Sequence, residues 1–462
     1  MKEERDRQSA AKAEAAGPAD GGHGGRMRAA VGSEGGGIKD DTDSLNVAVI
    51  GAGISGLLTA RELLREKHRV TVFEKSDKLG GTWVYEPQVE EDDVLHLDPN
   101  RSIVHSSLYS SLRTNLPRPL MGFSDYSFED KSYGDRRTFP GHDEVLKFLQ
   151  DFATEFGVTK VIRFKSEVVR VDSSDGVFVV EWRTMKVGTV AEVFDAVVVC
   201  NGHHTEPRVA DDVPGIKDWS RKQAHSHNYR VPDPYQDQVV VVIGNGPSAL
   251  DISQEIATVA KEVHLSSRSS NVKVSRLDGY KNMWQHSKIN HVYDDGKVVF
   301  QDGDSIEADF ILHCTGYKFH FPFLSTNNNV HVDDNRVGPL YKHVFPPQLA
   351  PRLAFVGITY NQGVLFRMLE LQSKWVALVF SGKILLPSED EMLVDVYKYY
   401  QQMEENGIPK RYTHTLDFKF EYVDWLAAQV GFGIEDRLKE ICRNLLRQFI
   451  LSPNDIREEF RL

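Results

Sequence analysis

The chain has 462 residues, of which 40% are hydrophobic and 26% are charged, and its formal net charge is -12. This length is too great for one simple core, so we expect two or three domains of an ordinary globular protein. Nucleic acids and anionic membrane surfaces favour basic proteins, so the negative charge argues against both and leaves small molecules as the expected ligands.

Residues 1–44 are rich in alanine, glycine and charged residues and contain almost no aromatic or branched apolar side chains. Such a segment has too little apolar surface to join a core, so we expect a disordered leader. Its acidic residues, among them Glu3, Glu4 and Asp6, argue against a transit peptide, because transit peptides are poor in acids.

The first predicted nucleotide-binding turn follows residues 47–50, an apolar run typical of a strand in a parallel sheet that is covered on both faces. The next residues have the spacing G-x-G-x-x-G, whose glycines serve a tight turn, the close approach of a pyrophosphate and the packing of a helix on the strand. The phosphates would bind at the start of that helix, where unpaired N–H groups favour anions. The expected cofactor contacts are Gly51, Gly53, Ile54, Ser55 and Gly56.

A second predicted strand, at 69–75, leads to Glu74, about twenty residues after the glycines. A carboxylate at this position accepts hydrogen bonds from ribose hydroxyls and repels a 2′-phosphate, which favours FAD or NAD over NADP. We expect Lys75 to line the same site. The stretch KLGGTW at 78–83 suits close approach of a ligand and contact with a flat aromatic face, although a surface turn with a core tryptophan is the alternative. Its expected contacts are Gly81, Thr82 and Trp83.

A second turn of the same kind follows the apolar residues 239–243. Ala249 replaces the third glycine and still allows close packing. The next predicted strand leads to Arg268, about twenty residues beyond the turn, where a guanidinium can bind a 2′-phosphate bidentately. The opposite charges of Glu74 and Arg268 predict FAD in the first turn and NADPH in the second, rather than two copies of a site for one ligand. The expected NADPH contacts are Gly244, Asn245, Gly246, Pro247, Ser248, Ala249 and Arg268.

Two further apolar stretches, at 195–204 and 309–319, suit a chain that leaves one nucleotide domain and later returns to it. We therefore predict an α/β fold with two Rossmann-like dinucleotide-binding domains, in which the NADPH domain is inserted in the FAD domain. Amphipathic stretches at 388–406, 415–431 and 434–451 predict helices that pack on the FAD domain. The expected boundaries are 45–211 for the first part of the FAD-binding domain, 212–324 for the NADPH-binding domain and 325–462 for the second part with the C-terminal helices.

The chain has three cysteines, Cys200, Cys314 and Cys442. They are too few and too far apart for a disulfide framework or a metal site, and no C-x-x-C pair supports dithiol redox chemistry. This pattern is typical of a reducing, cytoplasmic compartment. No window approaches the roughly 18 consecutive apolar residues that span a bilayer, so we expect no membrane segment.

These features together resemble the flavin-containing monooxygenases, and most closely the plant branch related to the glucosinolate S-oxygenases. The similarity covers about residues 45–440 and includes motifs beyond the two turns. In chain order these motifs are GGTW at 80–83, SLYSSLRTNLPRPLMGFSDYSF at 107–128, FPGHDEVLKFL at 139–149, KQAHSHNYR at 222–230, CTGY at 314–317 and LELQSKW at 369–375.

One family motif, Phe-x-Gly-x-x-x-His-x-x-x-Phe/Tyr, is matched only in part. It falls on Trp219, Arg221, His225 and Tyr229, and the first two positions depart from the pattern. The final tyrosine resembles the S- and N-oxygenating members, whereas the related Baeyer–Villiger enzymes have tryptophan there. We interpret the histidine as a structural residue between domains. A second departure is Pro119, where relatives carry glutamate.

The resemblance also assigns residues to the FAD site. The family's Thr-Asn pair falls on Thr114 and Asn115, which implies that the Asn115 side chain lies near the flavin C4a position and is catalytic. Further FAD contacts are implied at Val168 and at Asn361, where a strand predicted at 353–356 leads into a helix.

The resemblance implies an enzyme that uses FAD, NADPH and O2. NADPH would reduce FAD, O2 would add to form a C4a-hydroperoxide, and a small thioether would take the distal oxygen, while the protein positions the cofactor and excludes water. An amine is the alternative substrate, which would make the enzyme an N-hydroxylating monooxygenase. A disulfide reductase shares the two-site plan but needs the missing C-x-x-C pair. The non-enzyme alternative is a nucleotide-binding regulatory protein with a degenerate active site.

Overall fold

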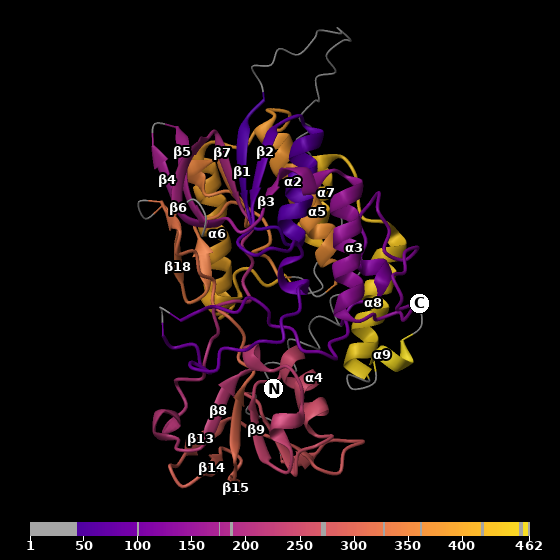
Figure 1. Ribbon diagram of the computed structural model, residues 1–462, viewed down its shortest axis with the longest axis vertical. Coiled ribbons are helices and arrows are strands. Elements are labelled where there is room, and N and C mark those ends of the chain that lie inside the picture. Colours follow the sequence, from indigo (N-terminus) through magenta and orange to yellow (C-terminus); the bar gives the residue numbers. More distant parts are fainter. Residues whose placement is uncertain are drawn as a thin grey trace.

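The computed structural model describes residues 44–98, 101–174, 176–184, 188–268, 274–326, 329–360, 363–416, 420–451 and 456–460. The leader expected at 1–44 lies outside the described residues except for Ser44, and so does the expected cofactor contact Asn361. The described chain forms an upper and a lower body, joined by several crossing segments (Figure 1).

The larger parallel sheet of the upper body is built from two parts of the chain that are far apart in the sequence. Every pair of neighbouring strands in it is parallel. Its strands in spatial order are β20 (Leu353–Phe355), β7 (Ala196–Val199), β1 (Asn46–Ile50), β2 (Arg69–Phe73) and β3 (Ile162–Arg163). Because β20 joins β7 after more than a hundred intervening residues, the segment between them is an insertion in this fold.

The inserted segment carries the sheet of the lower body. All its neighbouring strands are parallel except the edge pair β11 and β12. The strands in spatial order are β11 (Ser275–Arg276), β12 (Met283–His286), β10 (Glu262–Ser266), β9 (Val239–Ile243), β16 (Phe310–His313) and β8 (Lys222–His225). The predicted plan of one Rossmann-like domain inserted in another is therefore confirmed.

Three smaller sheets complete the strands. The four-stranded sheet consists of β17 (Leu324–Ser325), β4 (Glu167–Ser174), β5 (Val177–Thr184) and β6 (Gly188–Phe194). The other two consist of β13 (Ile289–Val292), β14 (Lys297–Phe300) and β15 (Ser305–Glu307), and of β18 (His331–Asp333) and β19 (Arg336–Gly338). The sequence pattern did not predict these three sheets.

The helices include the three that were expected toward the end of the chain. The α-helices of the described residues are α2 (Ile54–Arg65), α3 (His142–Glu155), α4 (Pro247–Ile256), α5 (Leu365–Phe380), α6 (Glu389–Glu405), α7 (Glu421–Val430), α8 (Asp436–Leu451) and α9 (Ile456–Glu459). The three expected helices are α6, α7 and α8. Helix α7 begins later than the predicted residue 415, because Thr415 pairs with Tyr360 and the Leu416 N–H donates to the Tyr360 carbonyl oxygen.

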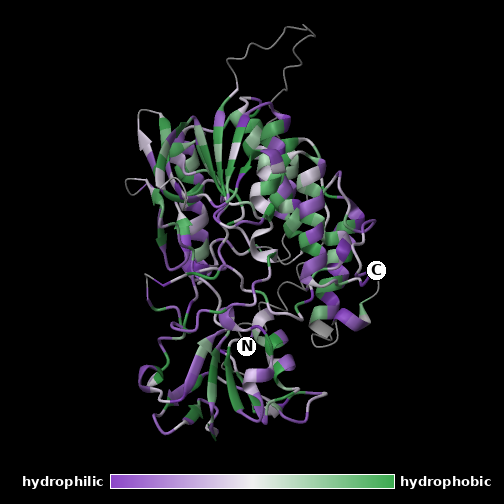
Figure 2. Cartoon of the chain, in the orientation of Figure 1, coloured by the Kyte–Doolittle hydropathy of each residue, from purple (hydrophilic) through white to green (hydrophobic). Residues whose placement is uncertain are grey.

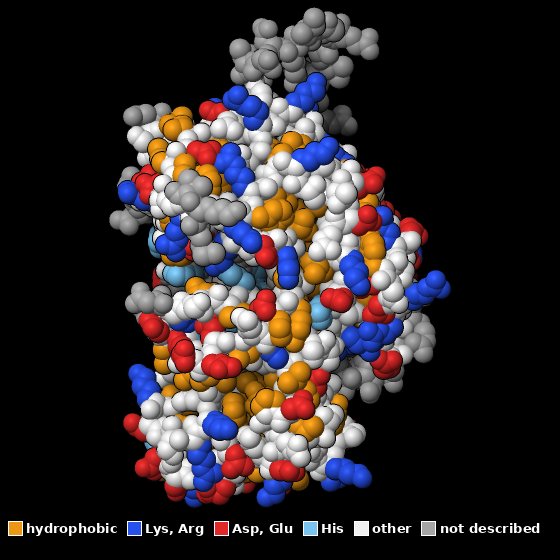
Figure 3. Space-filling model, viewed as in Figure 1, with side chains coloured by type: hydrophobic (Ala, Val, Ile, Leu, Met, Phe, Trp, Pro, Cys, Tyr) orange, Lys and Arg blue, Asp and Glu red, His pale blue; other side chains and the backbone are white. Residues whose placement is uncertain are grey.

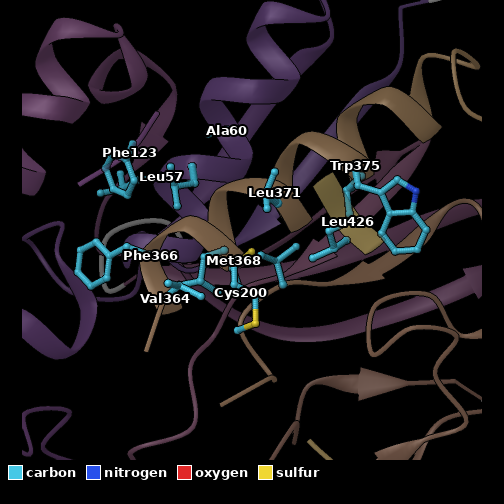
Figure 4. Close-up of a cluster of buried hydrophobic side chains, with 14 of the residues drawn as sticks. Leu57, Ala60, Phe123, Cys200, Val364, Phe366, Met368, Leu371, Trp375 and Leu426 are labelled. Atoms are coloured by element: carbon cyan, nitrogen blue, oxygen red, sulfur yellow. The ribbon is translucent and has the colours of Figure 1, made fainter. Parts of the chain in front are cut away.

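The five-stranded parallel sheet of the upper body is covered on both faces, which explains the continuous apolar character of β1 (Figure 2). Val47 and Val49 pack with the helices, whereas Ala48 and Ile50 pack with the four-stranded sheet. Helices α2 and α5 lie side by side, and Leu57 of α2 and Leu371 of α5 belong to one apolar core. In the same core Trp375 packs against α7, with its ring 5.1 Å from that of Trp425 (Figure 4). Complete burial of one such side chain stabilises the fold by about 1.5–3 kcal/mol, so this core fixes the turn between β1 and α2.

Candidate functional site

The two predicted nucleotide-binding turns occupy equivalent places in their sheets. The turn after β1 has β2 and β7 as neighbouring strands, and the turn after β9 has β10 and β16. In open parallel sheets, ligands bind beyond the carboxyl ends of the strands at such a switch in strand order. The topology therefore puts both turns where a dinucleotide is expected.

The first turn requires glycine at two positions. Gly51 has a φ of +102°, and a Cβ atom there would lie 2.6 Å from the carbonyl oxygen of Cys200. A Cβ on Gly56 would lie 1.9 Å from the carbonyl oxygen of Gly51. Only glycine lets α2 approach the strand this closely, as the fingerprint spacing predicts.

The start of α2 is open to an anion. Its N-cap is Gly53, and among the described residues no side chain caps its first N–H groups. Such uncapped groups favour a phosphate. The GGTW loop closes on the same place, because a Cβ atom on Gly81 would lie 2.8 Å from the Gly53 Cα atom. The 3-10 turn η2 (Gly81–Trp83) thus borders the first nucleotide-binding turn.

Glu74 lies beside this turn, immediately after β2. Its buried carboxylate accepts hydrogen bonds from the Ala52 N–H (2.9 Å) and the Ser76 N–H (2.8 Å). A carboxylate can accept about four hydrogen bonds, so it retains capacity for ribose hydroxyls. Lys75 is accessible to solvent, yet desolvation by the surrounding protein lowers the pKa of its ammonium group.

The second turn has the same geometry but a more exposed rim. Gly244 has a φ of +139°, and a Cβ atom there would lie 2.4 Å from the carbonyl oxygen of Cys314. Gly246 is the N-cap of α4, and no described side chain caps that helix. A Cβ on Gly246 would meet no described atom within 4 Å. Ala249 is fully buried, as expected for the third position of the motif.

Arg268 lies two residues after β10 and is exposed. Ile243 at the end of β9 pairs with Ser266 at the end of β10, which brings Arg268 to the same sheet edge as the second turn. The Asn245 side chain connects the two strand ends, because its Nδ2 donates to the Ser267 hydroxyl at 3.3 Å. This location suits the predicted contact with a 2′-phosphate, which stays a prediction.

Asn115 is exposed, whereas the threonine before it is buried and fixed. The Thr114 N–H donates to the Pro140 carbonyl oxygen at 2.8 Å, and its hydroxyl donates to the Leu116 carbonyl oxygen at 2.8 Å. The backbone therefore holds Asn115 in one place and leaves its amide available. Val168 is buried in β4 and packs in the same core as Phe73.

Of the other family positions, His225 and Tyr229 lie at the junction of the two bodies. His225 is fully buried; its Nε2 hydrogen-bonds the Gly316 carbonyl oxygen at 3.0 Å and its Nδ1 accepts the His227 N–H at 3.0 Å. Tyr229 donates its hydroxyl proton to Glu255 of α4 at 2.5 Å. Arg221 donates to the Ala308 carbonyl oxygen at 2.7 Å, so it stabilises the lower body. The Trp219 Nε1 donates to the Lys222 carbonyl oxygen at 3.3 Å, so both departures from the motif have partners in the structure. Pro119 is buried in the 3-10 turn η3 (Arg118–Met121).

Arg230 connects several segments at this junction, a role that its place at the end of the KQAHSHNYR motif does not predict. Its guanidinium donates hydrogen bonds to five backbone carbonyl groups, and its side chain is buried. The acceptors are Glu86, Gln88, Ser106, His227 and Tyr229. A single side chain thereby joins Glu86, Gln88 and Ser106 to the start of the lower body.

Histidine side chains gather in a hollow of the molecular surface near the middle of the view (Figure 3). His203, which follows β7, lies near this junction, where its ring is 5.2 Å from Phe319 and 4.3 Å from His204. Burial lowers the pKa of His203 to about 4 and that of His204 well below its usual value. Both rings are therefore neutral near pH 7.

The described residues fit a dinucleotide at each turn, since both helix starts are uncapped and both glycine turns approach the strand behind them. Across the described ranges, no group of histidine, cysteine and carboxylate side chains could hold a metal ion. None of the described helices combines the length and the apolar character that crossing a bilayer requires.

Comparison with known proteins agrees with this geometry. The family model described as flavin-binding monooxygenase-like matches residues 44–295 and 283–435. The flavin-containing monooxygenase FMO GS-OX5 of Arabidopsis thaliana is 56% identical over 407 residues, which cover 86% of this chain and 88% of that protein.

Two solved structures are similar along most of the chain. S-allyl-L-cysteine S-oxygenase from Allium sativum is 53% identical, with a TM-score of 0.88 over 90% of this chain and 96% of that one. Tmm from Pelagibacter is 25% identical, with a TM-score of 0.75 over 90% and 93% of the two chains.

Proposed function

The chain belongs to the flavin-binding monooxygenase-like family, and from this premise we propose that it oxygenates the sulfur atom of a small thioether metabolite. It is an enzyme, a monooxygenase that uses FAD and NADPH. Two relatives support sulfur as the acceptor atom, because one is named an S-oxygenase of S-allyl-L-cysteine and the other bears the designation GS-OX.

The observation that carries the proposal is the pair of glycine turns, of which the first lies beside the negatively charged Glu74 and the second shares its sheet edge with the positively charged Arg268. FAD would bind at the uncapped start of α2, with its ribose hydroxyls on Glu74. NADPH would bind at the start of α4, with its 2′-phosphate on Arg268. A 2′-phosphate is repelled by the first site and attracted by the second, so the two cofactors would not exchange places.

When bound, FAD accepts a hydride from NADPH and activates O2, so that one oxygen atom reaches the sulfur and the other leaves as water. The residues of the chain bind and orient. The helix starts would hold the pyrophosphates, and the Asn115 amide would donate a hydrogen bond within the reaction site. The protein around the site would exclude water, which limits the loss of reducing equivalents to hydrogen peroxide.

The expected reactants are therefore NADPH, O2 and an uncharged sulfur atom in a small molecule. A cytoplasmic location belongs to the same proposal, and it is supported by three cysteines that are all buried as free thiols.

The test is product analysis with the purified holoenzyme, NADPH and air. We expect S-allyl-L-cysteine or a glucosinolate that carries a thioether to give a sulfoxide, detected by mass spectrometry, in amounts close to the NADPH consumed at 340 nm. A tertiary amine and cyclohexanone serve as parallel substrates. If an amine oxide forms in preference to every sulfoxide, the oxygenated atom is nitrogen and not sulfur. If NADPH does not reduce the flavin and no product forms, the proposal is rejected.

A further inference from the structure

The segment 456–460 lies at the junction between α4 and the chain that carries Asn115 (Figure 1). Phe460 is buried, and its ring is 5.6 Å from that of Phe139. Arg113 donates to the Glu458 carboxylate at 2.7 Å. These contacts fix the short helix α9 against the upper body.

Arg457 connects this helix to both sides of the junction. Its Nη1 and Nη2 donate to the two carboxylate oxygens of Asp251, at 2.5 and 3.0 Å. Its Nε donates to the Thr114 carbonyl oxygen at 3.1 Å, and its Nη2 also donates to the Arg113 carbonyl oxygen at 3.0 Å. One guanidinium thus contacts α4 and the two residues before Asn115.

Asp251 lies in the second turn of α4, the helix whose first turn borders the NADPH site. It also accepts a hydrogen bond from the Tyr109 hydroxyl, and Ser111 donates to Glu255 one turn further along α4. The face of α4 toward the upper body is therefore held by the side chains of Tyr109, Ser111 and Arg457.

The Arg457–Asp251 pair has the geometry of a strong contact. A bidentate pair of guanidinium and carboxylate is charge-assisted and fixes both position and orientation. The two side chains are each 23% exposed, so solvent screens them only in part. Burial lowers the pKa of Arg457, whereas the hydrogen bonds and the charge of Asp251 raise it, and the resulting pKa lies above its ordinary value.

From these contacts we infer that Arg457 is a positioning residue, which holds the NADPH-binding helix α4 in a fixed place relative to Asn115. The inference rests on the proposed function, because it concerns the transfer between the two cofactor sites. Loss of the contact would let α4 move relative to the upper body. Hydride transfer would then slow, and more NADPH would be spent on hydrogen peroxide.

The test uses Arg457→Met and Arg457→Lys in the holoenzyme, with Arg437→Met as the matched control. Arg437 forms a bidentate pair with Glu129 at 2.6 and 2.7 Å, but that pair contacts neither α4 nor the Asn115 segment. Hydrogen exchange of residues 110–116 and 247–256 is measured first. Loss of a charged hydrogen bond changes a local opening equilibrium by roughly ten- to hundredfold, and we expect faster exchange of that order in Arg457→Met.

The kinetic readouts are the rate of flavin reduction by NADPH, the KM for NADPH and the fraction of NADPH that ends as hydrogen peroxide. We expect Arg457→Met to slow reduction and increase peroxide, while the KM for the thioether stays unchanged. Lysine should restore part of both, because it keeps the charge without the fork. Asp251→Asn should have a similar effect, and the double variant should lose less than the sum of the two single losses.

The inference is overturned if Arg457→Met matches Arg437→Met in hydrogen exchange and in peroxide yield. Should Arg457→Met lose FAD or unfold, the comparison is made with Arg457→Lys and Asp251→Asn, and unchanged exchange in both would equally overturn it. Failure of the wild-type enzyme to form any sulfoxide would reject the proposed function, whereas the exchange measurement would still decide the role of Arg457.

Discussion

At the scale of single residues, charge at two equivalent positions separates the two nucleotide sites. Glu74 and Arg268 each follow the second strand of a βαβ unit, at the sheet edge beside the glycine turn. The sequence predicts both positions because the spacing from turn to strand end is set by one helix and two short loops. It does not predict that Glu74 is held by two backbone N–H groups, since these bonds depend on how the turn closes.

Arg268→Ala should weaken the binding of NADPH much more than that of NADH. A charged hydrogen bond contributes about 1.5–3 kcal/mol, so we expect the KM for NADPH to rise roughly ten- to hundredfold. Steady-state kinetics with both nucleotides measure the ratio. Arg276→Ala is the control, because Arg276 is exposed in the same sheet. An unchanged preference for NADPH would remove Arg268 from the site.

Asn115→Ala should divert NADPH toward hydrogen peroxide, because the amide donor that serves the reaction site is lost. Removal of a single preorganised donor typically costs about 10²–10³ in rate, and we expect product formation to fall by that order. Asn115→Asp keeps the shape but has no donor when ionised, so it should behave like the alanine variant. Full coupling of NADPH to product in Asn115→Asp would contradict the donor role. Peroxide and sulfoxide yields are measured together.

At the scale of elements, the sequence predicts the parallel strands well and the antiparallel sheets poorly. The strands β1, β9 and β20 are buried on both faces, so they form continuous apolar runs next to glycine signals. The strands β4, β5 and β6 have mixed exposure and no such signal. The sequence also fails to predict the first residue of helix α7, because Thr415 pairs with Tyr360 and the helix begins only at Glu421.

Gly246→Ala should separate folding from NADPH binding. Gly246 has a φ of −79°, which alanine adopts, and its Cβ would meet no described atom, so we expect an unchanged melting temperature. The methyl group would occupy the approach of the pyrophosphate, and affinity for NADP+ should fall at least about tenfold. Gly244→Ala is the contrast, since its positive φ and the 2.4 Å contact with Cys314 should cost more than about 1 kcal/mol of stability. Calorimetry measures NADP+ binding, and thermal unfolding measures stability. Normal NADP+ affinity in Gly246→Ala would show that the pyrophosphate does not bind at this turn.

At the scale of the whole molecule, the sequence predicts which units exist but not how they are joined. The insertion could be predicted from the apolar stretches at 195–204 and 309–319, which precede and follow the second turn in the sequence. The junction depends on Arg230 and Arg457, whose partners come from distant parts of the chain. Hydrophobic periodicity and motif spacing describe only local structure, so the contacts of these two arginines could not be predicted before the fold was known, although Arg230 ends the KQAHSHNYR motif.

The same junction should make stability depend on pH through its buried histidines. His227 is fully buried, its Nε2 hydrogen-bonds the Val104 carbonyl oxygen at 2.7 Å, and His96, Glu90 and Arg230 surround it. Burial lowers the pKa of His227 to about 4, from an ordinary value of 6.5. Between these values the unfolded chain binds a proton that the folded chain does not. The stability that this residue provides is therefore present above pH 6.5 and is lost as the pH falls toward 4.

His227→Gln should reduce this pH dependence, because glutamine can keep a donor for Val104 but does not titrate. At pH 5.5, one unit below the ordinary pKa, the histidine costs about 1.4 kcal/mol relative to pH 7.5. Urea unfolding at both pH values should show the wild type losing that much more stability than the variant. His331→Gln is the control, because His331 is exposed in β18 and should leave the difference between the two pH values as in the wild type. An equal loss in His227→Gln and wild type would mean that the junction titrates through other groups, and that His227 takes up its proton in the folded protein.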